Sequence, residues 1–336
     1  MKRGAFLAST GAGLVALPRV AAATGGLDVG DSQALHTMRV LLASGAPDSP
    51  RTLDGWHFAW NGRTFRGTFS IEPLEDGRGG LVNALPLDAY LYGVLSREVS
   101  ASWPRAAQEA QAIVARTYAL GRLRPAHPYD VVAGDADQHY DGIEGETVEG
   151  RDAVDATAGT IVTYAGVAAQ VAYSACCGGH TADAGATWRV SVPYLAGVVD
   201  PHCVGTPDFA WDAVVTPDDL SRAFGAGFAG IGSLNAVELR DVDGSGRPRI
   251  VGFSGANGQF DATARDFRAK LGTNVVRSTL LKSAMLQPDG SLALSGNGRG
   301  HGVGLCQWGA RVMGAQGAAA RDIVQFYFPA TGFGRG

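Results

Sequence analysis

The sequence has no surplus of positive charge and no apolar run long enough to cross a membrane. Its 336 residues contain 28 lysines and arginines against 32 aspartates and glutamates, which gives a formal net charge of -4. This balance gives no reason to expect a nucleic-acid partner, because nucleic-acid binding favours a clustered excess of basic residues. The apolar run at 5–17 is shorter than the ~20 residues that a membrane-spanning helix needs. We therefore predict no transmembrane segment in the mature chain.

Two common ligand-binding loops are also missing, although parts of the sequence suggest them. Alternating acids resemble a calcium-binding EF-hand loop, but the twelfth residue counted from Asp137 is Val148, and counted from Asp241 it is Gly252. The closing bidentate acid is therefore absent from both segments. Alternating glycines at 298–304 fit neither the dinucleotide-binding pattern nor the phosphate-binding P-loop. Dense glycine there instead allows the backbone to approach a neighbouring segment or a sugar ring closely.

The N-terminus has the three parts of a secretory signal. Lys2 and Arg3 precede the apolar run at 5–17, and small residues follow up to Ala23. This arrangement is typical of a signal peptide cleaved near that alanine. The chain is 46% hydrophobic and long enough to bury a sizeable core. We divide it into a signal peptide at 1–23, a linker at 24–37 and one two-lobed domain at 38–332, and we expect a secreted, periplasmic or cell-wall-associated protein.

Short β-rich runs separated by turn residues precede the first helices. They lie at 38–42, 56–60, 64–71 and 80–85, and they predict a small β-meander. Further strands and helices follow without the regular strand-helix alternation of a parallel sheet. The pattern predicts the α+β class, with the meander and a helix pair leading into a mixed, β-rich lobe.

A single carboxylate marks the end of the first predicted helix. Pro86 has the backbone angle of a first helical residue, and apolar residues recur after it with helical spacing. Ser102 is placed to cap a second helix, so Glu98 falls at the break between helices, close to Trp103. A carboxyl sheltered from solvent there would have a raised pKa, as a proton donor requires. The alternative is a solvated helix-end glutamate, and spacing alone does not decide between the two.

Three sequence blocks in a fixed order carry a resemblance to a known family. The first is the helix pair with Glu98, the Trp103-Pro104 dipeptide and the run AQAIVARTYA at 110–119. The second is YSACCGGHT at 173–181, and the third is GRGHGVGLCQWGA at 298–310. The blocks are similar to the signature of the stage II sporulation protein D family, also called the LytB or amidase-enhancer family. The resemblance extends over 38–332, nearly all of the mature chain.

The resemblance implies a peptidoglycan lytic transglycosylase. Such an enzyme cleaves glycan strands between N-acetylmuramic acid and N-acetylglucosamine and leaves a 1,6-anhydro sugar. The family's catalytic glutamate precedes the Trp-Pro pair, and Glu98 stands in that place here. Ordinary glycosidases need two carboxylates, but in this reaction the sugar's own C6 hydroxyl supplies the nucleophile, so one acid/base group suffices.

Two alternatives remain open at this point. Some relatives act mainly as binders that enhance a separate amidase, so a non-catalytic wall-binding protein with an amidase partner is the first. A zinc-dependent hydrolase is the second. The first alternative and the transglycosylase share peptidoglycan glycan strands as the partner.

The same blocks suggest residues that line the glycan cleft. The candidate substrate-binding residues are Arg116, Gln138, Tyr140, Tyr173, Ser174, Gly178, Gly179, Thr181, His301 and Gln307. Arg116 lies on an otherwise apolar helix, where a buried arginine must be paired, and it could orient Glu98 or bind an acidic group of the substrate. His301, set among four glycines, could line the cleft or have a structural role.

Four cysteines in an exported chain suggest disulfide chemistry. The fourth is Cys306, and the bridge candidates are Cys176 or Cys177 with Cys203. On a strand only one of the two vicinal cysteines would face the partner. Zinc is the rival, on ligands drawn from Cys177, His180, His202 and Cys203; zinc occurs near the active site in some members of the family, on positions that do not map cleanly here. We expect the disulfide, with no cofactor and no metal ion.

Overall fold

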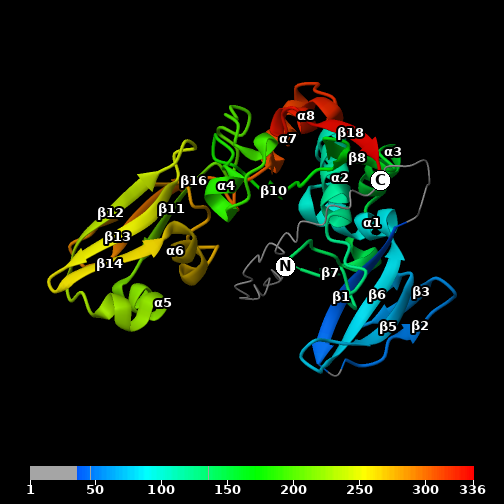
Figure 1. Ribbon diagram of the computed structural model, residues 1–336, viewed down its shortest axis with the longest axis horizontal. Helices are drawn as coiled ribbons and strands as arrows, with labels where there is room; N and C mark the ends of the chain where they lie inside the picture. The colour runs from blue at the N-terminus through cyan, green and yellow to red at the C-terminus, as the bar shows by residue number, and fades with distance from the viewer. Residues whose placement is uncertain (1–35, 46, 135) are drawn as a thin grey trace, which may run out of the picture.

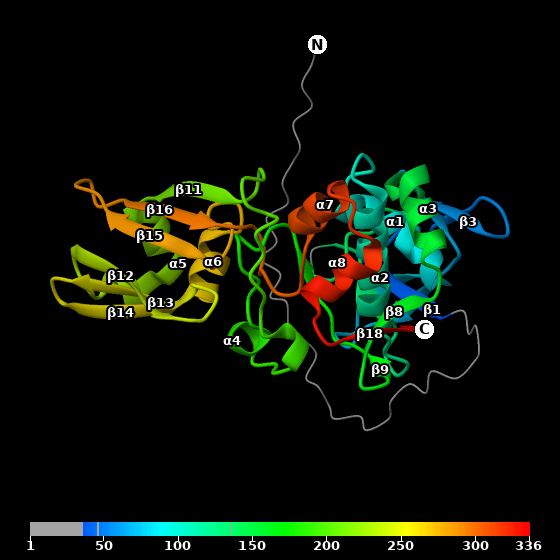
Figure 2. The same ribbon diagram turned by 90° about the horizontal axis from the view of Figure 1, so that it is seen from above.

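The computed structural model describes residues 36–45, 47–134 and 136–336. The predicted signal peptide and almost all of the predicted linker lie outside these residues. Figures 1 and 2 show two masses side by side, one built around α1 and α2 and the other around β11–β16, with α4 and β10 between them. The described residues contain no helix that combines the length and apolar character needed to cross a membrane.

The β-meander predicted ahead of the first helix is present as two small sheets. The larger has the order β5-β6-β1-β7 and consists of β1 (Thr37–Gly45), β5 (Thr68–Pro73), β6 (Gly79–Pro86) and β7 (Val131–Val132). The smaller consists of β2 (Arg51–Thr52), β3 (His57–Trp60) and β4 (Arg63–Arg66). Met38, Val40 and Leu85 are buried from the larger sheet against Tyr90 and Leu91 of the first helix. This apolar contact fixes the helix on the sheet.

Two helices form the centre of the first mass. These are α1 (Leu87–Glu98), with Pro86 as its N-cap residue, and α2 (Arg105–Leu120). One face of α2 contributes Ala112, Ala115 and Ala119 to the core beneath α1, and the opposite face contributes to a second core. Its small side chains allow close packing against α1, α3 (Val148–Ala156), α7 (Gln307–Ala315) and α8 (Ala320–Tyr327). A short 3₁₀ turn, η1 (Gly142–Gly145), packs on α1.

The second and third sequence blocks meet in a very short parallel pairing. Tyr173 of β10 (Tyr173–Ser174) pairs with Leu305 of β17 (Leu305–Cys306), and Ser174 pairs with Cys306. Gly304 allows this approach: its φ is +76°, and a Cβ there would collide with the Ala172 carbonyl oxygen. Around this pairing lie the sheet β18-β8-β9, formed by β8 (Thr160–Tyr164), β9 (Val167–Ala168) and β18 (Gly332–Arg335), and the short helices α4 (Ala184–Trp188) and η2 (Pro193–Leu195).

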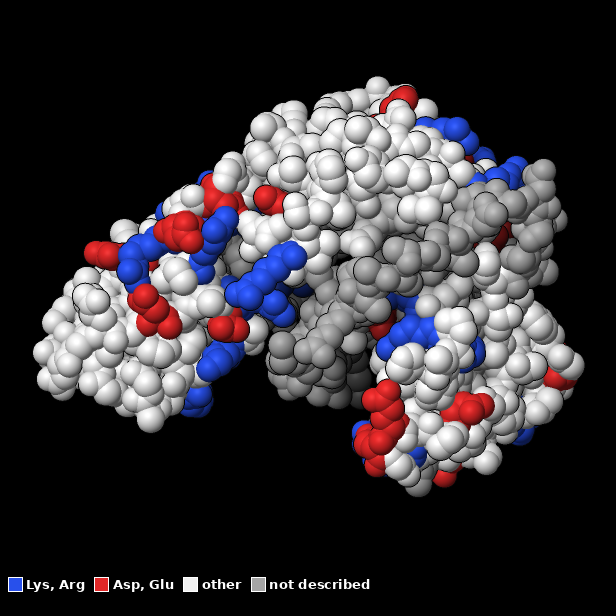
Figure 3. Space-filling view, viewed as in Figure 1, with Lys and Arg blue, Asp and Glu red and all other residues white. Residues whose placement is uncertain are grey.

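The other mass is a lobe of two three-stranded sheets and two helices. One sheet has the order β11-β16-β15, with β11 (Ala210–Val215), β15 (Leu281–Leu286) and β16 (Leu292–Asn297). The other has the order β12-β13-β14, with β12 (Leu234–Val242), β13 (Pro248–Gly255) and β14 (Gly258–Thr263). With α5 (Pro217–Ala229) and α6 (Ala264–Leu271) they enclose a core rich in phenylalanine. On the face seen in Figure 3, this lobe carries charges of both signs mixed together.

The helices and the separate mixed sheets of the two masses confirm the α+β class predicted from the sequence.

Candidate active site

Glu98 lies at the last residue of α1, where the chain leaves the helix. Val99 adopts an extended conformation (φ -135°, ψ 147°) and is buried, so the helix ends there. The connection to α2 is short, and Pro104, rather than Ser102, is the N-cap residue of α2. Ser102 instead forms a hydrogen bond with Ser100, Oγ to Oγ at 3.0 Å. The helix break places the Glu98 carboxyl, half-buried, beside the second and third sequence blocks.

A chain of hydrogen-bond donors ends on this carboxyl. Tyr90 donates from its hydroxyl to Gln138 Oε1 (3.2 Å), and Gln138 Nε2 donates to the Tyr173 hydroxyl (3.1 Å). The Tyr173 hydroxyl in turn hydrogen-bonds to Glu98. Gln307 Nε2 donates to Glu98 Oε2 at 3.3 Å. Of the candidates predicted from the sequence, the structure thus brings Gln138, Tyr173 and Gln307 together around Glu98.

The environment changes the acidity of Glu98. Burial raises the pKa of the Glu98 carboxyl, and hydrogen bonds from Tyr173 and Gln307, with the nearby His139, offset part of that rise. Burial also raises the pKa of Tyr173 far above the ordinary tyrosine value, so this phenol keeps its proton and remains a donor. The site therefore contains a carboxyl that holds its proton to higher pH than usual, fixed in place by neutral donors.

Two half-buried tryptophans lie near the acid on the flanking segments. Trp103 follows Glu98 in the connection to α2, and Trp308 follows Gln307 in α7; their ring centroids are 5.1 Å apart. Trp308 is fixed further because its Nε1 donates to Asp208 Oδ2 at 2.9 Å and the Arg311 guanidinium lies over its ring. The pair presents partly exposed aromatic surface on the two segments that adjoin Glu98 and Gln307.

A surface hollow of about 360 Å³ adjoins the site on the side of the N-terminal sheets. His139, whose backbone hydrogen-bonds to Glu98, is one of its lining residues. Trp60, Arg63 and Asp141 also line it. The hollow therefore offers an aromatic ring and groups of both charges a short distance from the acid.

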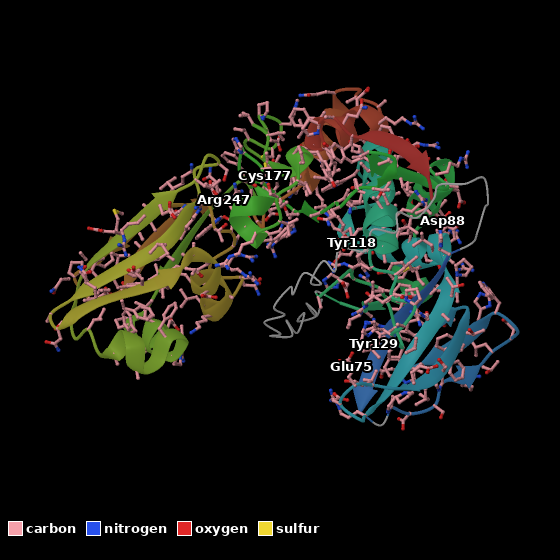
Figure 4. The ribbon with its side chains drawn as sticks, viewed as in Figure 1. Glu75, Asp88, Tyr118, Tyr129, Cys177 and Arg247 are labelled. Atoms are coloured by element: carbon pink, nitrogen blue, oxygen red, sulfur yellow. The ribbon has the colours of Figure 1, made fainter. Side chains whose placement is uncertain are left out.

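Arg116 does not belong to this site, contrary to the prediction. Its guanidinium is 1% exposed and forms an ion pair with Asp88 (Nε to Oδ1, 2.8 Å), with further hydrogen bonds to Thr157 and to backbone oxygens of α3 and β8. Asp88 stands ten residues before Glu98 on α1, which corresponds to roughly 15 Å along the helix. Figure 4 shows Asp88 on the side of α1 near the C-terminus. Arg116 joins α2 to α1 and α3 as a structural ion pair.

Three more predicted cleft residues have structural partners instead. His301 Nδ1 accepts from the Val303 N–H (3.0 Å), the ring also hydrogen-bonds to the Tyr173 backbone, and burial lowers its pKa to about 4. Tyr140 is buried, with its hydroxyl donating to Asn83 Oδ1 at 2.9 Å. Thr181 is buried and bonds to the Val198 backbone. Their polar atoms are occupied within the fold, although Tyr140 also lines the hollow with its ring.

The remaining block residues lie close behind the site. Ser174 follows Tyr173 on β10; it is buried, and its Oγ has no hydrogen-bond partner among the described residues. Gly178 and Gly179 have φ of +78° and +103°, and a Cβ on Gly178 would collide with the Asn297 backbone. These glycines form a turn that packs against the end of β16, so their role here is conformational.

The four cysteines are unbridged and buried, and their sulfurs gather in one place. Cys177 Sγ and Cys203 Sγ are 3.5 Å apart, well beyond the about 2.05 Å of a disulfide. Both vicinal thiols interact with Cys203, which corrects the expectation that only one would face it. The reason is that the chain bends at Ala175 and turns at Gly178, so strand alternation does not apply.

The histidines predicted as zinc ligands are not part of this sulfur cluster. Among the described residues, the group whose ligand atoms lie within 4.8 Å of one another consists of Cys177, Asp200, Cys203 and Cys306. His180 Nδ1 instead bonds to the Thr181 carbonyl at 2.7 Å, and the His202 ring packs edge-on to Phe326. Asp200 and Cys306 take the places that the sequence analysis gave to the two histidines.

Several residues of the site escaped the sequence analysis. Tyr90, His139 and Trp308 were not among the candidate residues singled out from the sequence. Trp308 could have been found from its position directly after Gln307, as a large aromatic in a glycine-rich block. Tyr90 could not, because its spacing is that of any core residue and only its hydroxyl distinguishes it.

Comparisons with known proteins agree with the resemblance carried by the three sequence blocks. The sequence model of the SpoIID family, described as "Stage II sporulation protein", matches residues 75–164. A protein of Brachyspira hyodysenteriae (strain ATCC 49526 / WA1), described as uncharacterized, is 34% identical over 281 residues, which cover 82% of this chain and 73% of the relative. Stage II sporulation protein D of Bacillus subtilis (strain 168) is 26% identical over 267 residues, or 74% of this chain and 75% of that protein.

One relative is named for an effect on another enzyme rather than for sporulation. The amidase enhancer of Bacillus subtilis (strain 168) is 26% identical over 295 residues, or 72% of this chain but only 40% of the longer enhancer. Together these matches place the chain in a class of proteins that are similar to stage II sporulation protein D over most of its length. The chain belongs to the SpoIID/LytB family.

Proposed function

We propose that this protein is a peptidoglycan lytic transglycosylase in which Glu98 is the acid/base. The observation that carries the proposal is the Glu98 carboxyl itself: half-buried, with a raised pKa, and held by Tyr173 and Gln307. A general acid needs a pKa near the working pH and a fixed position within reach of the leaving oxygen. The proposal also makes the protein an extracytoplasmic one, secreted, periplasmic or wall-associated.

The reaction needs only one titrating group of the protein. Protonated Glu98 gives its proton to the glycosidic oxygen between N-acetylmuramic acid and N-acetylglucosamine, and the bond from that oxygen to the anomeric carbon breaks. The resulting carboxylate takes the proton from the C6 hydroxyl of the muramic acid as its oxygen closes on the anomeric carbon. The 1,6-anhydro ring forms, no water is consumed, and Glu98 is again protonated. Tyr173 and Gln307 hold the carboxyl between the two transfers, because hydrogen bonds to a charged acceptor are stronger than those between neutral groups.

The surroundings of Glu98 suit a polysaccharide. Trp103 and Trp308 offer aromatic faces on which the apolar face of a sugar ring can rest. The hollow lined by Trp60 and His139 extends this surface along the direction of a chain. We assign the tryptophan pair and the hollow as neighbouring glycan subsites on the two sides of the acid.

The name of one relative favours a second candidate function. A similar cleft could hold glycan without turnover while the protein enhances a separate cell-wall amidase, as the name "amidase enhancer" suggests for the relative. That function requires the aromatic surface but not the proton on Glu98. The two candidates therefore differ in what the removal of one carboxyl does.

Replacement of the acid tests the choice. We expect Glu98→Gln, which preserves shape and removes the proton donor, to reduce release of anhydro-ended fragments from purified peptidoglycan by about 10²–10⁴-fold. Wall binding measured by co-sedimentation should stay within about twofold, because the amide still fits among Tyr173 and Gln307. The measurement is mass spectrometry of the digested wall.

Asp137 provides the matched control. Like Glu98, it lies near enough to Tyr90 to raise the pKa of that phenol, but its carboxylate is already held by the Val132 N–H at 2.9 Å and by Arg122. Asp137→Asn should keep the cleavage and the anhydro product. If the products instead had free reducing ends, and if their formation stopped in Asp137→Asn, the reaction would be a hydrolysis that uses two carboxylates. Full activity of Glu98→Gln would rule out the proposal.

A further inference from the structure

A cluster of four metal-ligating side chains lies at the junction of the two masses, and none of the four belongs to the hydrogen-bond network of Glu98. Three sulfurs and one carboxylate, from Cys177, Cys203, Cys306 and Asp200, lie within 4.8 Å of one another, and all four residues are buried. Figure 4 shows Cys177 close to Arg247, where the chain passes from one mass to the other. The four residues come from three segments that are distant in sequence, so the fold itself assembles the group.

The spacing of the sulfurs fits a shared ligand better than a covalent bond. Cys177 Sγ and Cys203 Sγ are 3.5 Å apart. Two thiolates bound to one tetrahedral zinc ion, at about 2.3 Å each, are separated by about 3.8 Å. A disulfide would need the two sulfurs at about 2.05 Å and would leave Cys306 and Asp200 in the same buried space.

Asp200 is a buried carboxylate without a cation. The residue is fully buried, and among residues 36–45, 47–134 and 136–336 it forms no ion pair with a lysine, arginine or histidine. Its oxygens accept from the Tyr327 hydroxyl (3.0 Å), the His202 N–H (2.9 Å) and the Cys177 thiol (3.1 Å). A buried charge of this kind is costly unless a cation or a metal compensates it.

Two backbone donors are directed at the Cys306 sulfur. Its sulfur accepts hydrogen bonds from the backbone N–H groups of Cys177 (3.2 Å) and Gly309 (3.4 Å). It is also the N-cap residue of α7, a helix of nine residues. Backbone donors and the positive end of a helix both stabilise an anionic sulfur.

We propose that Cys177, Cys203, Cys306 and Asp200 bind a structural zinc ion. Three thiolates and one carboxylate complete the tetrahedral set that zinc prefers, and the softness of the sulfurs selects zinc over calcium or magnesium. On binding, the three thiols release their protons to solvent. Because protein groups fill all four positions, the ion has no open position for water, so the proposed site is not a hydrolytic centre. This inference does not depend on glycan cleavage.

The zinc ion would fix the two segments that carry the partners of Glu98. Cys306 directly precedes Gln307, and its strand pairs with the strand of Tyr173. Asp200 and Cys203 connect the same point to the chain that enters the β11–β16 lobe. Loss of the ion would therefore loosen Gln307 and Tyr173 without removing either side chain.

Metal content and thiol content together test the proposal. The full chain, purified without chelator after growth with added zinc, should contain one zinc ion per molecule by inductively coupled plasma mass spectrometry. Removal of even an outer-shell partner costs about 10–100-fold in metal affinity, so Cys177→Ser, Cys203→Ser, Cys306→Ser and Asp200→Asn should each lose zinc on dialysis by at least that factor. Cys176→Ser should keep it, because the Cys176 thiol interacts with Cys203 but does not belong to the group of four.

Measurements on the unaltered chain keep the test valid if a variant does not fold. Ellman titration of the protein denatured with a chelator and without reductant should count four thiols. Cobalt exchanged into the native protein should give the thiolate charge-transfer absorption of a tetrahedral site. A zinc-free protein with two or fewer thiols would overturn the proposal in favour of a disulfide, and zinc loss in Cys176→Ser with retention in Asp200→Asn would overturn the ligand set.

Discussion

At the scale of single residues, Glu98 is subject to two opposing effects. Burial favours the protonated carboxyl, whereas hydrogen bonds from Tyr173 and Gln307 favour the carboxylate. The same donors that orient the acid therefore limit how far its pKa rises. A group with a balanced pKa can give a proton and take one back, which is what the proposed reaction needs in its two halves.

This balance predicts the direction of a pH shift. In Tyr173→Phe the carboxylate loses one donor while burial remains, so the pKa of Glu98 should rise. Because the acid must be protonated to act, the high-pH limb of kcat/KM for glycan cleavage should move to higher pH, even though the rate maximum falls. Tyr140→Phe removes an equally buried hydroxyl that bonds to Asn83 rather than to the acid, and its pH profile should match the unaltered protein. A limb that stays in place in Tyr173→Phe would mean that this phenol does not contact the acid.

Arg116 gives the contrasting prediction, on stability rather than activity. Arg116→Met removes a fully buried charge from Asp88, Thr157 and two backbone acceptors, and we expect it to lower the free energy of unfolding by about 3–5 kcal/mol. Arg105→Met, on the exposed end of the same helix, should change it by less than about 1 kcal/mol. Denaturant unfolding measures both. A variant at 116 that keeps its stability but loses glycan affinity would restore the substrate-binding role.

At the scale of elements, the site depends on a pairing of only two residues per strand. The pairing of β10 with β17 sets Tyr173 opposite Leu305, which is two residues before Gln307. Gly304 makes the approach of these strands sterically possible. Gly304→Ala should therefore lower the free energy of unfolding by about 2–4 kcal/mol, because a strained φ and a collision with Ala172 add together. Gly317→Ala, at φ +93° with open space around it, isolates the backbone term and should cost about 1 kcal/mol. Equal effects at the two positions, measured by thermal unfolding, would contradict the steric argument.

The elements also show what the sequence could and could not predict. The end of α1 at Glu98 and the helical run of α2 were predictable, because apolar spacing and a proline are local signals. The cap was not: Ser102 has the right chemistry, but Pro104 takes the position and Ser102 bonds to Ser100. Partners that come from distant segments, such as Gln307 for Glu98 and Asp200 for the cysteines, leave no mark in local spacing. The three blocks indicated that these segments matter, and only the fold shows which side chains within them meet.

At the scale of the whole molecule, the β11–β16 lobe is an insertion between two parts of the site. The chain enters it after Cys203 and returns at the glycine-rich segment before His301. The lobe has its own phenylalanine core, so its internal packing does not fix its position on the rest of the protein. A separate contact must do so if the returning segment is to place Gln307 accurately.

Arg247 makes such a contact, and its loss should loosen the lobe. The side chain is 4% exposed, and its guanidinium donates to the Cys177 carbonyl (2.7 Å) and the His180 carbonyl (2.9 Å) across the junction. Arg247→Met leaves these buried acceptors without a donor, which costs about 1–3 kcal/mol each. The lobe core should stay folded, and limited proteolysis should now cut first in the connections at 204–209 and 298–300. Arg240→Met, on the exposed surface of the same lobe, is the control and should keep the original cleavage pattern. If the pattern were unchanged in both variants, other contacts would hold the lobe.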